Sequence, residues 1–260
     1  MRIYLIFTKE SLTLRIILHF ILNNTMKINL FSLFVCFCCI SCNQNSDLPI
    51  FISGNSIPID SVVGKDNSII KLYEPYKIGL DSIMNEVLCY SPYFLEKSKP
   101  ASRLSNWMAD VCLNSLDEKY DVDFCLLNYG GIRATLPKGA IITKNIFQLM
   151  PFENELVIIE IPDSSFTKAL NYLKLSSGHP ISGIKLNVSA DEISHTLKPS
   201  HTVKIITSDY LANGGDKMFF FADSIKMLKT GLKIRDLLLA ECKTIDTLKT
   251  VIDNRFSYEQ

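Results

Sequence analysis

Neither sign of charge predominates in this sequence, and histidine and tryptophan are scarce. The 260 residues include 27 Lys and Arg against 27 Asp and Glu, with four histidines and one tryptophan. Proteins that bind nucleic acid polymers neutralise the phosphates with a strongly basic surface. The balanced charge therefore gives no electrostatic reason to expect a nucleic acid polymer as a partner.

The four histidines form no recognisable metal or catalytic site. They are His19, His179, His195 and His201, and none has acidic residues at the spacing of a metal-binding motif. His179, which follows Gly178, is interpreted as a surface-turn residue rather than a ligand contact. No serine–histidine or cysteine–histidine arrangement of a nucleophilic hydrolase is recognisable either. We therefore expect no metal ligands and no catalytic residues on this chain.

No apolar run reaches the roughly 20 residues that a membrane-spanning helix needs. Two apolar stretches, residues 14–22 and 28–40, are separated by polar residues. A better interpretation starts translation at Met26, so that Lys27 and the second stretch form a secretory signal. Residues 1–41 are accordingly predicted to be a leader that is removed.

The predicted signal ends in Cys39-Ile40-Ser41-Cys42, which resembles a bacterial lipobox. In such signals the last cysteine is acylated and becomes the new N-terminus. We therefore predict a lipid anchor on Cys42, followed by a polar tether, with the tether region spanning residues 42–48. This places the protein in the bacterial cell envelope, periplasmic or associated with the outer membrane. An ordinary cleaved signal with a chance cysteine is the alternative.

Four cysteines follow the leader, and no two of them form a Cys-x-x-Cys pair. They are Cys89, Cys112, Cys125 and Cys242. An oxidising compartment would permit disulfides between them. Single cysteines within apolar runs are more often packed core thiols, and Cys125 lies in such a run.

Hydrophobic periodicity predicts a mixture of helices and strands. Helices are expected from about residue 71, over 101–116, after a cap at Thr143, after a cap at Asp163 or Ser164, and over 231–242. Strands are expected within 49–71 and over 123–127, 155–161, 184–188 and 203–207. Because helices and strands alternate unevenly, we predict a single α+β domain over residues 49–260, with a mixed α/β sheet and packed helices.

Three loops combine glycine with polar and aromatic residues. They are Asn128-Tyr129-Gly130-Gly131-Ile132-Arg133, Pro151-Phe152-Glu153-Asn154 and Ser208-Asp209-Tyr210-Leu211-Ala212-Asn213-Gly214-Gly215-Asp216. Paired glycines let a backbone approach a ligand closely, and an arginine suits a phosphate or a ribose hydroxyl. Taken singly, each loop is most simply a structural turn.

In combination and in this order, the three loops resemble the C-terminal domain of the 5'-nucleotidase and UDP-sugar hydrolase family. Gly139-Ala140-Ile141-Ile142-Thr143 resembles the Gly-x-Ile-Thr segment of that family, and Ser177-Gly178 resembles its Ser-Gly turn. The resemblance covers roughly residues 72–252. It implies a domain that binds the nucleotide or nucleoside part of a phosphohydrolase substrate.

The resemblance also implies roles for particular residues. Phe152 and Tyr210 match two aromatic residues that hold the base between them, and such stacking contributes about 1–3 kcal/mol per base. Arg133 matches an arginine that faces ribose and phosphate, and Asp216 matches a carboxylate that accepts ribose hydroxyls. The remaining positions implied to form the pocket are Asn128, Gly130, Gly131, Asn154, Gly178, Gly214 and Gly215.

The sequence departs from the family pattern in two places. Tyr129 stands where relatives carry a further glycine, so its side chain is expected to fill pocket space or to add another ring. Relatives often have Asn-x-Gly-Asn on the early helix, where this chain has Arg103-Leu104-Ser105-Asn106. The upstream phosphate-facing arginines of the family have no clear counterpart, and Lys97, Lys99 and Arg103 are the residues available to replace them.

Full-length members of the family hydrolyse phosphate esters with a two-metal site on a separate N-terminal metallophosphatase domain. Its signature segments, Asp-x-His and Gly-Asn-His-Glu, do not occur in this sequence. The leading hypothesis is a split enzyme: this chain, without a cofactor of its own, binds the nucleotide, and a metallophosphatase chain carries the divalent metals. The alternatives are a non-catalytic nucleoside- or nucleotide-binding lipoprotein and a structural module without a ligand.

Overall fold

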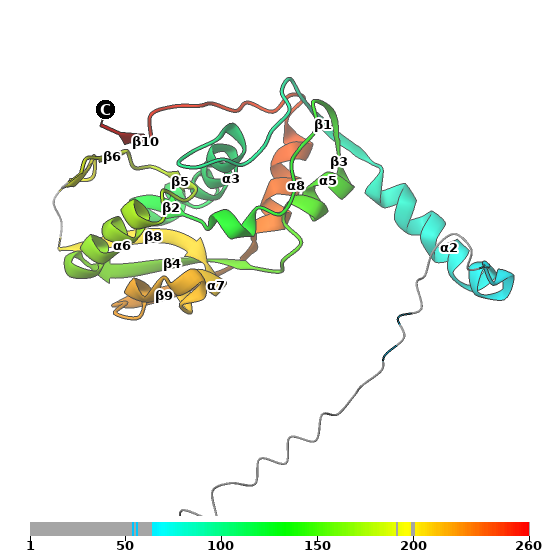
Figure 1. Cartoon of the computed structure of the whole chain (residues 1–260), viewed down its shortest axis with the longest axis horizontal. Coiled ribbons are helices and arrows are strands. Elements are labelled where there is room, and N and C mark those ends of the chain that lie inside the picture. The colour runs from blue at the N-terminus through cyan, green and yellow to red at the C-terminus, as the bar shows by residue number, and fades with distance from the viewer. Residues whose placement is uncertain (1–53, 55, 57–63, 191, 199–200, 260) are drawn as a thin grey trace, which may run out of the picture. The chain divides into compact units, whose positions relative to one another are not determined.

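A computed structural model of the protein describes residues 54, 56, 64–190, 192–198 and 201–259 (Figure 1). The fold reported below is that of the unit formed by residues 65–260. The predicted leader, Cys42, the tether and the strands expected before residue 64 lie outside the described residues, so they stay predictions. Within the described part, no helix combines the length and apolarity that crossing a membrane requires.

The centre of the fold is a five-stranded mixed sheet in the order β5-β2-β8-β4-β9 (Figure 1). Its strands are β2 (Phe124–Leu126), β4 (Glu155–Pro162), β5 (Ile181–Ser182), β8 (Thr202–Ser208) and β9 (Lys226–Lys233). β2 runs parallel to β8, whereas β4 runs antiparallel to both β8 and β9. The predicted α+β class is therefore confirmed.

Both faces of the central strands β4 and β8 are buried, because their successive residues pack into two different cores. Ile158 of β4 and Ile206 of β8 belong to one hydrophobic cluster. Ile159 and Ile205, the next residues on the same two strands, belong to the other. This explains the nearly continuous apolar sequence of β4, which a half-exposed strand would not need.

Helices supply the rest of the two cores. α3 (Arg103–Asn114), α5 (Thr143–Leu149) and α8 (Ile234–Thr244) contribute to the first cluster, and α6 (Asp163–Leu175) contributes to the second. α3 starts at a capping box in which Ser102 and Ser105 bond reciprocally to each other's backbone N–H groups. Its buried face includes Leu104, Trp107 and Met108, as the periodicity predicted.

The smaller elements complete the fold. β1 (Val87–Ser91) pairs with β3 (Gly139–Ile142), and β6 (Leu186–Val188) pairs with β7 (Ile193–His195) and β10 (Phe256–Tyr258). The short helices are α4 (Asp117–Tyr120) and α7 (Asp209–Ala212), with 3-10 turns at Tyr129–Gly131, Gly215–Lys217 and Phe219–Phe221.

Three local predictions were wrong. Gly231–Lys233 belongs to β9, and α8 begins only at Ile234. Thr143 and Asp163 are the first residues of α5 and α6 rather than their caps. At α5, the Asn145 side chain accepts the Ile142 N–H at 2.9 Å instead. These errors concern ends of elements, where the residue preceding a helix carries little hydrophobic signal.

The helix predicted from residue 71 exists as α2 (Asn67–Met84), capped by Asp66, but it buries none of its residues. Seven of its large apolar side chains are exposed, namely Ile69, Leu72, Tyr73, Tyr76, Ile78, Leu80 and Ile83. An amphipathic helix normally owes its stability to the face that it buries. α2 therefore presents an apolar surface that no described residue covers.

The four cysteines after the leader are free thiols buried in the fold: Cys89, Cys112, Cys125 and Cys242. All four belong to the first hydrophobic cluster. This agrees with the interpretation as packed core thiols.

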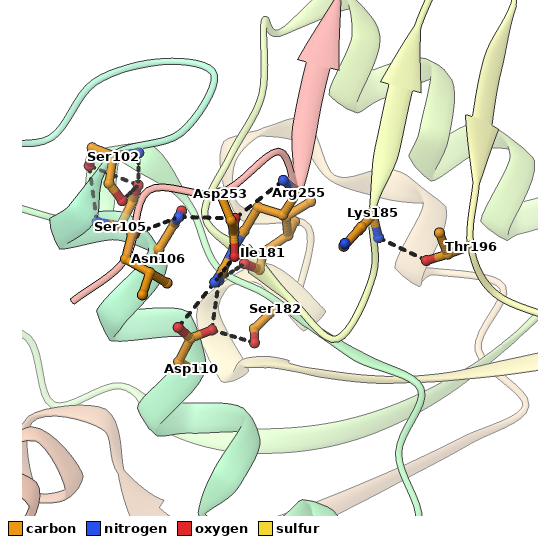
Figure 2. A network of polar contacts seen from close by, with 11 residues as sticks. Ser102, Ser105, Asn106, Asp110, Ile181, Ser182, Lys185, Thr196, Asp253 and Arg255 are labelled. Atoms are coloured by element: carbon orange, nitrogen blue, oxygen red, sulfur yellow. Dashed lines mark hydrogen bonds and ion pairs between the residues drawn. The ribbon is translucent and has the colours of Figure 1, made fainter. Parts of the chain in front are cut away.

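The C-terminal segment is fixed to α3 by the buried side chain of Arg255 (Figure 2). Its guanidinium donates to both carboxylate oxygens of Asp110 at 2.6 and 3.1 Å, and to both of Asp253 at 2.7 and 2.9 Å. It also donates to the Ile181 carbonyl at 2.9 Å. Asn106 adds a hydrogen bond from its side chain to the Val251 carbonyl at 3.2 Å. Every donor of this arginine is used, so the network is structural.

We predict that Arg255→Met destabilises the protein strongly, because it leaves two carboxylates partly buried without their cation. Breaking one side of a buried ion pair costs about 3–5 kcal/mol. Urea unfolding followed by circular dichroism measures the loss. Lys77→Met, which removes the exposed Lys77–Asp81 pair, is the control and should cost less than about 1 kcal/mol. Equal losses in the two variants would contradict the structural role of Arg255.

Candidate functional site

Three loops meet at one end of the central strands because of the directions in which these strands run. β2 and β8 run parallel, so the loops that follow them emerge at the same end of the sheet. β4 runs antiparallel to β8, so the loop that precedes β4 lies at that end as well. The meeting point is a cavity of about 560 Å³. Its lining residues are Asn128, Gly130, Gly131, Arg133, Phe152, Glu153, Asn154, Tyr210 and Asp216.

The structure thus brings together eight of the residues that the sequence predicted for the pocket. Each of the three predicted loops contributes, although they are separated by many residues in the chain. Gly178, Gly214 and Gly215 are not among the residues that line the cavity. Glu153 lines it without having been predicted, since an exposed glutamate in a loop carries no distinctive signal in a sequence.

Asp216 is the centre of the polar part of the cavity. Asn128 Nδ2 donates to its Oδ2 at 2.7 Å, and the Tyr210 hydroxyl donates to its Oδ1 at 2.9 Å. The Tyr172 hydroxyl donates to the Asp216 carbonyl at 2.8 Å. Each carboxylate oxygen can accept more than one hydrogen bond. The side chain is therefore held in position by the protein while it can still accept hydroxyl groups of a ligand.

Two glycines are required by close contacts around this carboxylate. A Cβ on Gly131 would lie 2.7 Å from Asn128 Oδ1, and a Cβ on Gly215 would lie 2.5 Å from Cε1 of the Tyr210 ring. Gly215 thus allows the tyrosine ring to approach the backbone closely. Its neighbour Gly214 has a φ of +87°, which glycine adopts without strain.

Gly178 lies outside the cavity lining, in a turn that ends a helix. It follows the end of α6 with a φ of +93°, and its N–H donates to the Leu173 carbonyl at 3.0 Å, as in a common helix C-terminal motif. A Cβ at this position would lie 2.8 Å from the Pro100 carbonyl oxygen. Its close approach is therefore to the protein's own backbone.

Phe152 and Tyr210 place two aromatic rings on the cavity. Their exposures, 41% and 47%, are high for such large side chains, so much of each ring remains available for contact. Arg133 lies near Phe152, with its Cζ 5.8 Å from the ring centroid. On the same loop as Phe152, Asn154 Nδ2 donates to Asp209 Oδ1 at 3.0 Å. The cavity therefore combines two apolar rings, a carboxylate and a cation.

Glu153 is ionised at all physiological pH values. Hydrogen bonds from Lys233 and then from Arg235 lower the pKa of its carboxyl group to about 2. Its charge is balanced by these two cations, so the carboxylate adds little repulsion toward an anionic ligand.

Tyr129 does not line the cavity, which corrects the expectation that its ring fills pocket space. The ring instead lies beneath two ammonium groups, 4.3 Å from Lys97 Nζ and 5.3 Å from Lys99 Nζ. Lys97 Nζ also donates to the carbonyls of Tyr129 and Ile132, at 3.2 and 2.6 Å. Lys97 therefore supports the glycine turn from outside, while Arg103 donates to the Thr250 carbonyl on the C-terminal segment.

His179 is buried, so its interpretation as a surface residue was wrong. Its Nδ1 accepts the Tyr129 N–H at 3.1 Å, and its ring lies 5.5 Å from that of Tyr172. Burial, together with the nearby charge of Lys99, lowers the pKa of His179 to about 4. A neutral ring with an unprotonated Nδ1 is what the hydrogen bond to the turn requires.

Comparison with known proteins places these observations in one family. Residues 90–223 match the family described as 5'-nucleotidase, C-terminal domain. The match covers more than half of the 260 residues and includes all three cavity loops. The chain belongs to this family.

Individual relatives agree with that assignment. An apyrase of Tabanus yao is 23% identical, over 77% of this chain and 43% of its own length. Human 5'-nucleotidase is 24% identical, over 66% of this chain and 37% of its own length. The crystal structure of a 5'-nucleotidase precursor from Thermus thermophilus has the same fold, with a TM-score of 0.62 and 19% identity over 72% of this chain and 42% of that one. The chain spans less than half the length of these relatives.

We predict that the burial of neutral His179 makes the stability depend on pH. The unfolded chain binds a proton at this residue near pH 6.5, whereas the folded protein binds it only near pH 4. The free energy of unfolding should therefore fall as the pH decreases from 6.5 to 4, by roughly 2–3 kcal/mol from this residue. In His179→Gln, whose amide oxygen can accept the Tyr129 N–H, this part of the decrease should disappear.

Urea unfolding at a series of pH values measures the difference. His201→Gln is the matched control, since His201 is exposed, and its stability should follow the unmodified protein. If His179→Gln loses as much stability as the unmodified protein between pH 6.5 and 4, the assignment of a neutral buried His179 is wrong.

Proposed function

We propose that this chain binds the nucleotide or nucleoside part of a substrate, as the substrate-binding part of a 5'-nucleotidase-type phosphohydrolase. The observation that carries the proposal is the composition of the cavity. Phe152 and Tyr210 offer two partly exposed rings, Asp216 offers a fixed carboxylate and Arg133 offers a cation, all on one cavity. The names of the relatives, apyrase and 5'-nucleotidase, support the same class of substrate.

Each part of a nucleotide has a chemical counterpart among these residues. A planar base stacks on aromatic rings whatever its identity. Ribose hydroxyls donate to a carboxylate, which Asp216 supplies. A phosphate pairs with a guanidinium, which Arg133 supplies. The cavity volume also falls in the range of about 300–1,000 Å³ that is usual for small-molecule sites.

We further propose that hydrolysis requires a separate metallophosphatase chain that carries divalent metals. Paired metals of that kind stabilise the attacking and leaving oxygens of phosphoryl transfer. The proposal is supported by a sequence without the Asp-x-His and Gly-Asn-His-Glu segments. The exposed apolar side chains of α2 are also consistent with a surface that another protein covers. Lipid anchoring at Cys42 would hold both chains at the bacterial envelope.

We predict that the protein binds AMP and that the double variant Phe152→Ala, Tyr210→Ala binds it at least about 30-fold more weakly. Stacking contributes about 1–3 kcal/mol per base, so the loss of two rings should cost at least about 2 kcal/mol. Because 1.4 kcal/mol corresponds to a tenfold change in affinity, this loss corresponds to about 30-fold. Isothermal titration calorimetry measures the affinities. Tyr76→Ala removes an exposed aromatic side chain outside the cavity and is the control. Unchanged affinity in the double variant would show that the two rings do not hold the base.

A second prediction concerns catalysis. This chain, mixed with a metallophosphatase chain encoded beside it and a divalent metal, should release phosphate from AMP, and neither chain alone should do so. The Phe152→Ala, Tyr210→Ala variant should reduce the rate of the mixture. Full activity of this chain alone would disprove the split enzyme. Binding of AMP without phosphate release from the mixture would favour the alternative, a nucleotide-binding lipoprotein without catalysis.

A further inference from the structure

The loop that carries Phe152 is held from behind by an arginine that does not line the cavity. Arg235 lies in the first turn of α8, and only 8% of it is exposed. Its Nη1 faces the carbonyl oxygens of Pro151 and Phe152 at 3.4 and 3.5 Å. Its Nη2 donates to the Glu153 carboxylate. One guanidinium thus contacts three consecutive residues of the loop.

Neighbouring contacts complete the attachment of this loop to α8. The Arg235 guanidinium also lies against the Phe147 ring of α5, with its Cζ 4.5 Å from the centroid. The N–H of Ile234 donates to the Asn154 carbonyl at 3.1 Å. Lys233 forms an ion pair with Glu153. The four residues of the loop, 151–154, are therefore all tied to residues 233–235.

Burial of the charged Arg235 side chain is unfavourable, so its contacts with the loop must compensate for that cost. Its Nε is buried without a hydrogen-bond partner among the described residues. An unsatisfied donor on a buried cation is destabilising, and it persists where the group has another task. Here the visible task is to fix a loop that has no regular secondary structure between α5 and β4.

We propose that Arg235 is a positioning residue that holds the Phe152 ring in the orientation that stacks on the base. This inference rests on the proposed nucleotide-binding function. A ring that is already in place does not have to be ordered when the ligand binds, so its stacking contributes fully to affinity. Arg235 acts through the loop and does not contact the ligand.

The position of Arg235 behind the Phe152 loop predicts that its loss weakens binding of the base more than binding of the ribose and phosphate. Arg235→Met should bind AMP about tenfold more weakly, because the freed loop must be ordered on binding. Binding of ribose 5-phosphate, which has no base to stack, should change less than about twofold, since Asp216 and Arg133 belong to other loops. Calorimetry measures AMP, and NMR titration measures ribose 5-phosphate, with the full chain in both experiments.

Three further variants make the test specific. Lys243→Met removes a cation from the last turn of the same helix, where it pairs with Glu86, and should leave both affinities unchanged. Arg235→Lys retains the charge but loses the planar fork, so its AMP affinity should lie between those of Arg235→Met and the unmodified protein. Glu153→Gln weakens the attachment without removing the arginine and should show a smaller selective loss. If Arg235→Met does not fold, Arg235→Lys replaces it, because Glu153 itself lines the cavity.

The possible results separate this inference from the proposed function. No AMP binding by the unmodified protein would reject the proposed function itself. If the unmodified protein binds AMP and Phe152→Ala weakens that binding, wild-type affinity in folded Arg235→Met would overturn only the role of Arg235. Equal losses for AMP and ribose 5-phosphate would overturn it too, because they would indicate general disruption of the cavity.

Discussion

The pairing of β8 with β2 on one side and β4 on the other is the constraint on which the site depends. The parallel register places Phe124 opposite Ile205, and the antiparallel register places Leu156 opposite Ser208. With these directions, the end of β2, the end of β8 and the start of β4 lie at the same end of the sheet. The two cores on either face of these strands keep the strand ends in place, so the three loops have a rigid base.

The cavity loops are stiffened by residues that stand behind them. His179 and Lys97 hold the turn that begins at Asn128, through the Tyr129 N–H and two carbonyls. Arg235 holds the loop of Phe152 in the same manner. Asp216 is fixed from within the cavity by Asn128 and Tyr210. The turn at Asn128, the loop of Phe152 and the Asp216 carboxylate are therefore held by the protein's own contacts, an arrangement that would lower the entropic cost of binding in the proposed function.

The chain belongs to the 5'-nucleotidase C-terminal domain family and spans less than half the length of the relatives described above. The most distinctive exposed feature outside the cavity is α2. Seven of its large apolar side chains are exposed, whereas helices in proteins owe most of their stability to the packing of an apolar face. A covering surface would explain why the sequence keeps this apolar face.

Some elements carried too little sequence signal to be predicted. β9 has the sequence Lys-Met-Leu-Lys-Thr-Gly-Leu-Lys and lies exposed at the edge of the sheet, so it shows no alternation of buried and exposed residues. The strands β3 and β10 are three or four residues long and take their conformation from their partners. Hydrophobic periodicity requires longer segments with one buried face.

The sequence by itself determined the class of the fold, the main helices and strands, and the residues of three loops that form most of the cavity. These follow from local patterns and from motifs in a recognisable order. Only the tertiary structure decided that Gly178 packs on Pro100, that the Tyr129 ring lies beneath Lys97 and Lys99, and that His179 is buried. It also revealed Arg235 behind the loop of Phe152. Such roles depend on contacts between residues far apart in the chain, and no local pattern encodes which distant backbone a side chain will meet.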